Sequence, residues 1–311
     1  MKSLITGVAG FIGSHLAEKL LELGHEVVGF DKFLDNYPRA YKEANLAPLQ
    51  GQAKFVFHER DLLGVDLQEA LRDVQYLFHL AGQPGVRSSW GTEFNRYTEN
   101  NIMLTQQLLE AAKVSHLRKF VYASTSSVYG DTDDLPMRES GATRPVSPYG
   151  VSKLAAEHLC YLYCQAFGVP TVALRFFTVY GPRQRPDMFF HIFLRGLLRG
   201  EAVPQFDDGE QTRDFTFCSD IVDGMIKAAF YPDVGEVFNL GGGSRVSLLK
   251  AIALTEKIAG RSAKLIRQDR QTGDVRHTSA SLEAARAKLG YAPAVGLEEG
   301  LQRQWRWIEG Y

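Results

Sequence analysis

Cysteine is scarce in this sequence, and neither sign of charge is in excess. The 311 residues include three cysteines and carry a formal net charge of −1. A small, odd number of cysteines in a long chain does not fit the disulfide framework of a secreted protein. Cys160 and Cys164 share one face of an expected helix, but two thiols without nearby partners are typical of core residues, so we expect no metal. The balanced charge gives no basis for binding nucleic acid.

Long hydrophobic runs are also missing. The opening MKSLITG is too short for the apolar stretch of a signal peptide. No later run approaches the ~18 apolar residues that a membrane-spanning helix needs. Hydrophobic residues nevertheless make up 45% of the chain, which is enough for a substantial core. We therefore expect a globular, cytoplasmic protein with no membrane partner, whose ligand is a small molecule.

Short β-rich runs alternate with longer helical patterns through the first half of the sequence. Examples are SLIT followed by HLAEKLLELG, and KFVYA followed by SPYGVSKLAAEHLCYLYCQAFG. Parallel neighbouring strands need helical crossovers, so the pattern predicts an α/β fold with a doubly wound parallel sheet of the Rossmann type. We expect residues 1–178 to form this domain and residues 179–311 to form mainly a smaller, substrate-binding lobe. A strand near 236–240, in EVFNLGGG, is expected to return to the sheet, so that the two parts interleave.

A glycine turn near the N-terminus predicts a phosphate cradle. In TGVAGFIGSHL, Gly7, Gly10 and Gly13 follow a strand and open a helix. Glycine allows the tight turn and lets a pyrophosphate approach the backbone, while free N–H groups at the helix start meet the anion. Phe11 and Ile12, inside the turn, are expected to contact the cofactor as well. The preceding strand and the following helix favour a dinucleotide site over a merely structural turn.

The ends of the following strands carry residues that suit the rest of a dinucleotide. Asp31 ends EVVGFD, where a carboxylate can accept hydrogen bonds from a ribose diol and repel a 2′-phosphate. NAD is therefore the expected cofactor, although Lys32 next to it weakens the preference over NADP slightly. The expected contacts further along the chain are Asp61 and Leu62 at the adenine, and Leu80, Ala81 and Gly82 at the nicotinamide half.

Tyr149 and Lys153 stand four positions apart at the start of the alanine-rich segment SPYGVSKLAAE. Residues at this spacing share a helix face, and a neighbouring ammonium can lower the pKa of a tyrosine from about 10. An arbitrary pair of this kind is more often simply solvated. Here the pair follows the turn STSSVYG, whose hydroxyl groups can share a proton with the phenol; they belong to Ser124, Thr125, Ser126 and Ser127. We therefore predict a proton-transfer site beside the dinucleotide.

The whole chain resembles the extended short-chain dehydrogenase/reductase family, particularly its nucleotide-sugar 4-epimerases. The resemblance rests on five ordered motifs: TGVAGFIGSHL, STSSVYG, SPYGVSKLAAE, LRFFTVYGPRQRPDM and DGEQTRDFTFCSDIVDG. It implies Tyr149 as the catalytic base, Lys153 as the group that lowers its pKa and contacts the cofactor ribose, and Thr125 as the assisting hydroxyl. The further cofactor residues that it implies are Ser124, Phe176 and a buried asparagine beneath the cofactor, Asn101.

The residues after Thr125 favour epimerisation over the other reactions of this family. Related dehydratases and UDP-glucuronate decarboxylases usually carry an acidic residue there, whereas this chain has Ser126 and Ser127. The simpler reaction oxidises C4 of the sugar and returns the hydride to the other face, so that NAD is regenerated. The segments GQPGVRSSWG and RFFTVYGPRQRPDMFFH resemble UDP-glucuronate 4-epimerases in particular. This resemblance implies conversion of UDP-glucuronate to UDP-galacturonate.

Arginines near the ligand edge suit an acidic substrate. A planar guanidinium binds carboxylate bidentately, so we expect Arg185 to bind the C6 carboxylate, with Arg87 and Arg183 at the same edge. The alternative is that these arginines pair with phosphates or surface acids. The remaining substrate contacts implied by the resemblance are Arg213 at the diphosphate, Asp274 and Arg276 at the uridine half, and Ser126 and Thr178 at the sugar, Thr178 standing where many members have asparagine.

Several other functions stay open on the sequence alone. They are a UDP-glucose or UDP-N-acetylglucosamine 4-epimerase, a UDP-glucuronate decarboxylase, and a non-catalytic NAD-binding sensor. A decarboxylase would release CO2, and a sensor would bind NAD without consuming sugar. The intact set of Thr125, Tyr149 and Lys153 argues against the sensor. The resemblance also implies a homodimer formed through helices at about 98–114 and 149–167.

Overall fold

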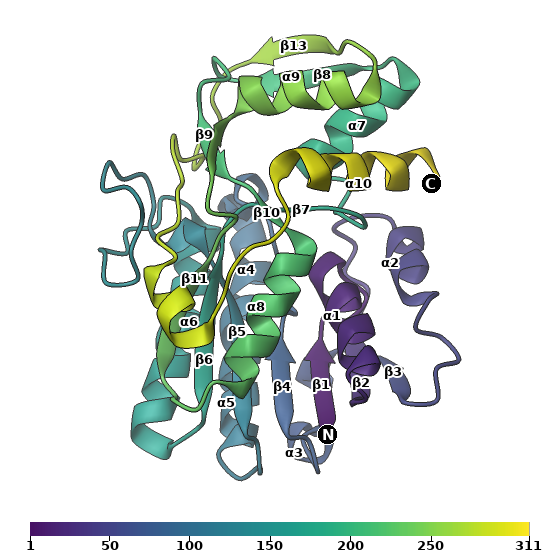
Figure 1. The fold of residues 1–311 in the computed structure, drawn as a ribbon. Helices are drawn as coiled ribbons and strands as arrows, with labels where there is room; N and C mark the ends of the chain where they lie inside the picture. The colour runs from purple at the N-terminus through teal and green to yellow at the C-terminus, as the bar shows by residue number, and fades with distance from the viewer. Residues whose placement is uncertain (311) are drawn as a thin grey trace.

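The computed structural model describes residues 1–310 and is built on a central sheet of seven parallel strands (Figure 1). The strands lie in the order β11, β6, β5, β4, β1, β2, β3, and every neighbouring pair is parallel. Their bounds are β1 Lys2–Thr6, β2 Glu26–Asp31, β3 Phe55–Glu59, β4 Tyr76–His79, β5 Lys119–Thr125, β6 Thr171–Phe176 and β11 Glu236–Leu240. The predicted α/β fold with a doubly wound parallel sheet is confirmed.

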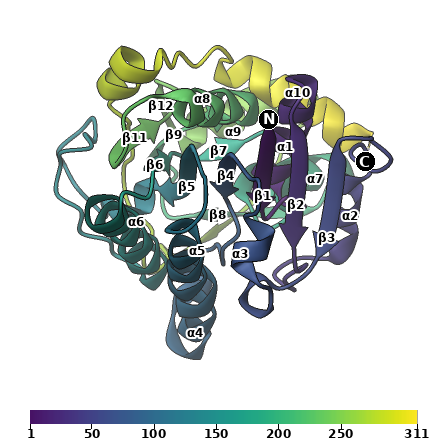
Figure 2. The ribbon, with the colours of Figure 1, turned by 90° about the horizontal axis from the view of Figure 1, so that it is seen from below.

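Helices cover both faces of the sheet, with α1 and α8 on one side and α5 and α6 on the other (Figure 2). The helices of this part are α1 Phe11–Glu22, α2 Arg39–Leu46, α3 Leu67–Ala70, α4 Phe94–Tyr97, α5 Leu104–Ala112, α6 Pro148–Phe167 and α8 Cys218–Phe230. Successive strand residues point to opposite faces. Accordingly, Leu4 and Ile5 of β1 are both fully buried but belong to different core clusters. A strand buried on both faces is typical of a parallel sheet.

The start of α6 is fixed by its own sequence. The hydroxyl of Ser147 accepts a hydrogen bond from the N–H of Gly150 at 3.1 Å, and Pro148 occupies the first helical position. Proline is favoured at this position because an N–H there would have no partner within the helix. The φ of proline is also already helical. The helix ends at Gly168, which has a left-handed φ of 71°. Tyr149 therefore lies in the first turn, at the carboxyl edge of the sheet.

A smaller lobe covers the carboxyl ends of the strands (Figure 1). Its helices are α7 Phe189–Arg199, α9 Leu248–Ala259 and α10 Leu297–Glu309, and its paired strands are β8 Ala202–Phe206 with β13 Lys264–Gln268, and β9 Thr212–Asp214 with β12 Arg245–Ser247. The short strands β7 Val179–Tyr180 and β10 Thr216–Phe217 pair beneath it. The strand β11 belongs to the large sheet and α8 packs against it, although both elements follow β7 in sequence. The division into functional domains at residues 178 and 179 stays a prediction.

Short helical segments complete the chain. The 3-10 segments are Leu62–Gly64, Arg87–Ser89, Gly91–Glu93 and Ser126–Val128, and the π-helical segments are Thr98–Met103 and Ala285–Leu289. The first π-helical segment contains Asn101 and joins α4 to α5. Wider helical turns of this kind frequently occur at functional sites.

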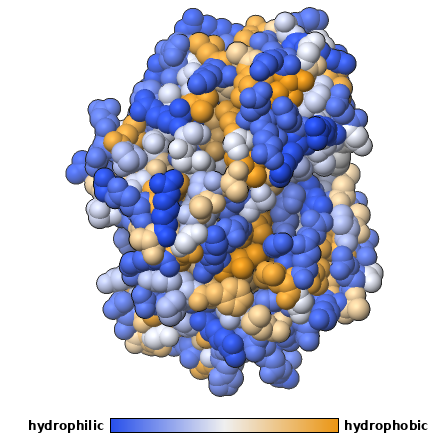
Figure 3. All heavy atoms as spheres, in the orientation of Figure 1, coloured by the Kyte–Doolittle hydropathy of each residue, from blue (hydrophilic) through white to orange (hydrophobic). Residues whose placement is uncertain are grey.

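The face of the molecule seen in Figure 3 is mainly hydrophilic, with apolar side chains gathered toward its middle. None of the helices within residues 1–310 is long and apolar enough to cross a membrane. Cys160, Cys164 and Cys218 are unpaired and buried. The described part of the chain also contains no group of three or more His, Cys, Asp or Glu residues that could hold a metal ion.

Candidate active site

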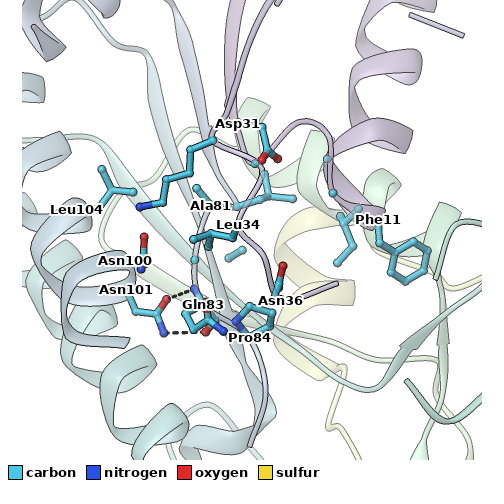
Figure 4. Close-up of a pocket in the computed structure, with 18 of the residues that line it drawn as sticks. Phe11, Asp31, Leu34, Asn36, Ala81, Gln83, Pro84, Asn100, Asn101 and Leu104 are labelled. Atoms are coloured by element: carbon cyan, nitrogen blue, oxygen red, sulfur yellow. Dashed lines mark hydrogen bonds between the residues drawn. The ribbon is translucent and has the colours of Figure 1, made fainter. Parts of the chain in front are cut away.

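A pocket lies at the carboxyl ends of the strands, between the glycine turn and the start of α6 (Figure 4). All the residues that we expected to contact the cofactor line this one pocket: Gly7, Gly10, Phe11, Ile12, Gly13, Asp31, Lys32, Asp61, Leu62, Leu80, Ala81, Gly82, Asn101, Ser124, Tyr149, Lys153 and Phe176. Arg185, expected to bind the substrate, lines it too. The structure therefore brings the expected cofactor residues together with one substrate residue, and their individual roles remain proposals.

The glycine turn has the geometry of a pyrophosphate cradle. Gly7 adopts a left-handed φ of 73°. A Cβ added to Gly13 would lie 2.3 Å from the carbonyl oxygen of Gly7, and one added to Gly7 would lie 2.9 Å from the backbone nitrogen of Ala81. The turn can therefore close only with glycine, and the first N–H groups of α1 face the pocket without helical partners. These residues fit a dinucleotide.

Asp31 is held rigidly at the end of β2. Its carboxylate accepts hydrogen bonds from the N–H groups of Phe33 at 2.8 Å and Ala9 at 3.2 Å, and from the ammonium of Lys42 at 3.2 Å. Both charged side chains are 7% exposed. Lys32, in contrast, pairs with Asp61 at 2.9 Å near the surface. The carboxylate is thus fixed beside the pocket, where a ribose diol can donate to its remaining lone pairs.

Asn101 is buried beneath the pocket, as the resemblance implied. Its side-chain oxygen accepts a hydrogen bond from the N–H of Gln83 at 2.7 Å, and its amide donates to the carbonyl of Gln83 at 3.1 Å (Figure 4). The same amide donates to the hydroxyl of Ser152 at 2.9 Å. The asparagine therefore ties the loop after β4 to α6. This contact places Gln83 at the pocket wall.

Tyr149 is half-buried and lies against the ring of Tyr97, with 6.2 Å between the ring centroids. Burial raises the pKa of Tyr149, while a hydrogen bond with Thr125 and the positive charge of Arg185 act in the opposite direction. We had expected Lys153 to lower this pKa. In the protein by itself burial outweighs the opposing effects, and the positive charge that acts on the phenol comes from Arg185, so the role of Lys153 in lowering this pKa stays a prediction.

Lys153 lies deeper in the pocket than Tyr149. Its ammonium sits 4.4 Å from the centre of the Tyr122 ring, a favourable cation–π distance. Burial lowers the pKa of Lys153 to about 8, and Glu157 partly offsets this effect. Lys153 therefore loses its proton more easily than an exposed lysine does.

Arg185 pairs with Asp187 through two hydrogen bonds of 3.0 and 2.9 Å. Asp187 is the more exposed of the two and does not line the pocket, whereas Arg185 does. A substrate carboxylate can therefore approach the guanidinium from the pocket side. Arg183 adopts a left-handed φ of 64° and pairs with Glu18 on α1. Only one of the two arginines in GPRQRPD therefore faces the pocket.

The other expected substrate residues lie outside the pocket lining. Arg87 pairs with Asp274 at 2.7 Å and stacks 3.8 Å from the ring of Phe206. Arg213 donates to backbone carbonyls, including that of Val275 at 2.9 Å. The remaining three are Arg276, which pairs with Asp207 and Asp208 at 3.0 and 2.7 Å, Ser126 at the start of a 3-10 segment, and Thr178 between β6 and β7. The alternative that Arg87, Arg183 and Arg185 pair with acids describes all three in this structure, and Arg276 pairs with acids as well.

Sequence analysis missed several pocket residues. They are Phe30, Leu34, Asn36, Tyr37, Lys42, Arg60, Gln83, Pro84, Asn100, Leu104 and Ala123. The loop FLDNYP after Asp31 carried a signal, since such loops follow the strand ends that bind ligands. Lys42 carried none, because its burial results from pairing with Asp31 in the fold.

Comparison with known proteins places the chain in a family. The model of the NAD dependent epimerase/dehydratase family matches residues 3–241, so the chain belongs to this family. An uncharacterized UDP-glucose epimerase of Bacillus subtilis (strain 168), YtcB, is 46% identical over 98% of this chain and 96% of its own. UDP-glucuronate 4-epimerase of Thermodesulfobacterium geofontis is 35% identical over 98% and 95%. The crystal structure of UDP-glucuronic acid 4-epimerase from Bacillus cereus with UDP-glucuronic acid and NAD has a TM-score of 0.97, with 44% identity and coverage of 100% and 99%.

Proposed function

We propose that this protein is an NAD-dependent epimerase that inverts C4 of a UDP-sugar and converts UDP-glucuronate to UDP-galacturonate. The observation that carries the assignment is the single pocket in which the glycine turn, Tyr149, Lys153 and Arg185 meet. The close likeness to an epimerase that binds UDP-glucuronic acid and NAD supports the same substrate. NAD is the cofactor of this reaction.

The proton chemistry belongs to Tyr149. Its phenolate takes the proton of the C4 hydroxyl as the C4 hydride leaves, which yields a 4-keto sugar. When bound, NAD accepts that hydride and later returns it. The ketone turns its other face, and Tyr149 returns the proton to the oxygen as the hydride adds to C4. Thr125 shares a hydrogen bond with the phenol throughout, and Lys153 supplies positive charge behind it.

Arg185 gives the reaction its specificity in this proposal. A 4-keto uronate is a β-keto acid, and it loses CO2 when the carboxylate bond lies perpendicular to the ketone. A bidentate guanidinium holds the carboxylate in one plane, and thereby protects the intermediate. The absence of an acidic residue at Ser126 and Ser127 removes a general acid that decarboxylation or dehydration could use.

We assign the rest of the nucleotide to the side chains of Arg87, Arg213, Asp274 and Arg276, outside the cofactor pocket. Arg87 and Arg213 would bind the diphosphate, while Asp274 and Arg276 would close over the uridine half. The pairing of Arg87 with Asp274 supports this placement, because an incoming diphosphate could replace the carboxylate on the same guanidinium. Ser126 and Thr178 would then contact the sugar between the diphosphate and Tyr149.

We further propose a homodimer formed by the outer face of α5 and α6. Large apolar side chains are exposed there: Met103, Val114, Val151, Tyr161, Leu162 and Phe167. A second copy that packs its own pair of helices on this face would remove them from water. A cytoplasmic location is also part of the proposal, and the three unpaired cysteines support it.

A panel of UDP-sugars tests the function directly. Purified protein is incubated with UDP-glucuronate, UDP-glucose and UDP-N-acetylglucosamine, and the products are resolved by NMR. We expect UDP-galacturonate from UDP-glucuronate, no CO2 and no net NADH. Preferential turnover of UDP-glucose would favour the activity after which the Bacillus subtilis relative is named. Release of CO2 would identify a decarboxylase instead.

A further inference from the structure

A buried carboxylate lies one helical turn beyond Lys153. Glu157 follows it by four residues on α6 and so projects from the same helix face. Arg175 on β6 donates two hydrogen bonds to this carboxylate, at 3.1 and 2.5 Å, and the hydroxyl of Ser124 on β5 donates a third at 2.6 Å. The two charged side chains are each 5% exposed. A helix and two strands thus meet at one carboxylate behind the cofactor pocket.

This ion pair needs a reason beyond stability. Removing two charges from water is costly, and a well-packed apolar pair of the same volume often stabilises a protein equally well or better. The surroundings would suit such a pair, because Ala156, Cys160 and Tyr163 of α6 are buried in an apolar cluster. What distinguishes Glu157 is that Ser124, one of its partners, lines the cofactor pocket.

The charges around Lys153 single out the same carboxylate. His79 on β4 is neutral, because burial lowers its pKa to about 3. Cys160 on α6 is also neutral, because burial raises the pKa of its thiol. Tyr149 and the Tyr122 ring of β5 carry no charge in the resting protein, since burial raises the pKa of both phenols. The guanidinium of Arg175 on β6 is charged as well, but it is bound by Glu157 itself.

We propose that Glu157 is a positioning residue for the reaction at Tyr149: it keeps the ammonium of Lys153 charged and fixes the direction of the Ser124 hydroxyl. The inference rests on the proposed function, since that reaction needs a charged lysine. Ser124 gives its only hydroxyl proton to Glu157, so its oxygen meets the pocket as an acceptor for donors of a bound ligand. Arg175 holds the carboxylate in place for both tasks.

The test follows the pH dependence of turnover in Glu157→Gln. Activity should fall at high pH as Lys153 loses its proton. Removing the carboxylate lowers the pKa of Lys153 further, so the alkaline limb of kcat moves to lower pH by about one unit. Glu157→Asp keeps the charge and should restore most of that limb. Glu236→Gln removes a carboxylate that pairs with Lys288 at the far end of the sheet, and it should leave the profile unchanged.

A double variant covers the risk that Glu157→Gln leaves Arg175 unpaired and unfolds the chain. Glu157→Gln/Arg175→Gln removes both charges together, which buried pairs tolerate far better than the loss of one partner. The Lys153 side chain is also titrated directly by carbon NMR of its methylene next to the ammonium, with Lys153→Arg to assign the signal. This readout needs no turnover. A wild type that epimerises no UDP-sugar would overturn the proposed function, whereas an unmoved lysine titration in the folded variants would overturn the role of Glu157.

Discussion

At the scale of single residues, the proposed chemistry depends on a phenol that burial makes less acidic. Burial raises the pKa of Tyr149, and two groups counteract it: the hydroxyl of Thr125 and the guanidinium of Arg185. Arg185 therefore has two effects, one on the carboxylate of the substrate and one on the base itself. Lys153, whose pKa burial lowers to about 8, contributes charge only while it stays protonated. Turnover thus requires Tyr149 without its proton and Lys153 with its proton, a combination that the positive charge of bound NAD would favour by lowering the pKa of Tyr149.

Replacement of Tyr149 by phenylalanine removes the base and keeps the ring. We expect Tyr149→Phe to lower kcat by about 10²–10⁴-fold, the usual contribution of a general base, while the protein still retains NAD. Turnover is followed by NMR, and NAD is quantified after denaturing the purified protein. Tyr161→Phe, at an exposed position of the same helix, serves as the control. Substantial activity in Tyr149→Phe would assign the proton transfer to another group.

Replacement of Arg185 separates its two effects. Arg185→Gln should lower kcat/KM for UDP-glucuronate about 10–100-fold, the range of a lost charge-assisted hydrogen bond. The loss for an uncharged UDP-sugar should be smaller. Because the guanidinium lowers the pKa of Tyr149, the acidic limb of kcat should move to higher pH with every substrate. Arg183→Gln, which loses only the partner of Glu18, is the control. Equal losses for charged and uncharged sugars would remove Arg185 as the carboxylate-binding residue.

At the scale of elements, local signals predicted most of what surrounds the cofactor pocket. Glycine spacing identified the turn before α1, and the helical pattern SPYGVSKLAAEHLCYLYCQAFG contains α6. The helix α2 was missed because RAYKEANL is mostly polar and lacks an apolar stripe. Two of its three buried side chains, Lys42 and Asn45, pack through hydrogen bonds to Asp31 and to the carbonyl of Ala9. Such contacts arise only in the folded chain.

The glycine turn can be tested by one methyl group. A Cβ at residue 13 would lie 2.3 Å from the carbonyl oxygen of Gly7, so Gly13→Ala must displace either the turn or α1. We expect a loss of about 1–3 kcal/mol in the free energy of unfolding and little NAD in the purified protein. Gly64→Ala, where a Cβ meets open space, should change neither quantity. Thermal unfolding and cofactor content measure both, and full NAD occupancy in Gly13→Ala would contradict the cradle.

At the scale of the whole molecule, the lobe and the sheet meet over the carboxyl ends of the strands. Ion pairs such as Arg87 with Asp274 join residues that are far apart in sequence. The sequence predicted that these side chains belong to the ligand edge, but not the acid that each arginine would contact. That choice depends on how the lobe packs, and no local pattern encodes it. The same reason hid the pair of Glu157 and Arg175.

The proposed dimer gives a prediction at this scale. Leu162→Arg places a charge on the exposed face of α6, which a second copy would bury. We expect the variant to sediment as a monomer at concentrations where the wild type is a dimer. Ile266→Arg, at an exposed apolar position on β13 of the lobe, should leave the mass unchanged. An equal mass for Leu162→Arg and the wild type would rule out this face as the interface.

The fate of the C4 hydrogen tests the central claim most directly. UDP-glucuronate labelled with deuterium at C4 is incubated with the purified protein in ordinary water, and the product is analysed by NMR. If one bound NAD takes the hydride from C4 and returns it to the opposite face, UDP-galacturonate will form with the deuterium still at C4. Loss of the label to solvent, or a UDP-pentose accompanied by CO2, would contradict the account.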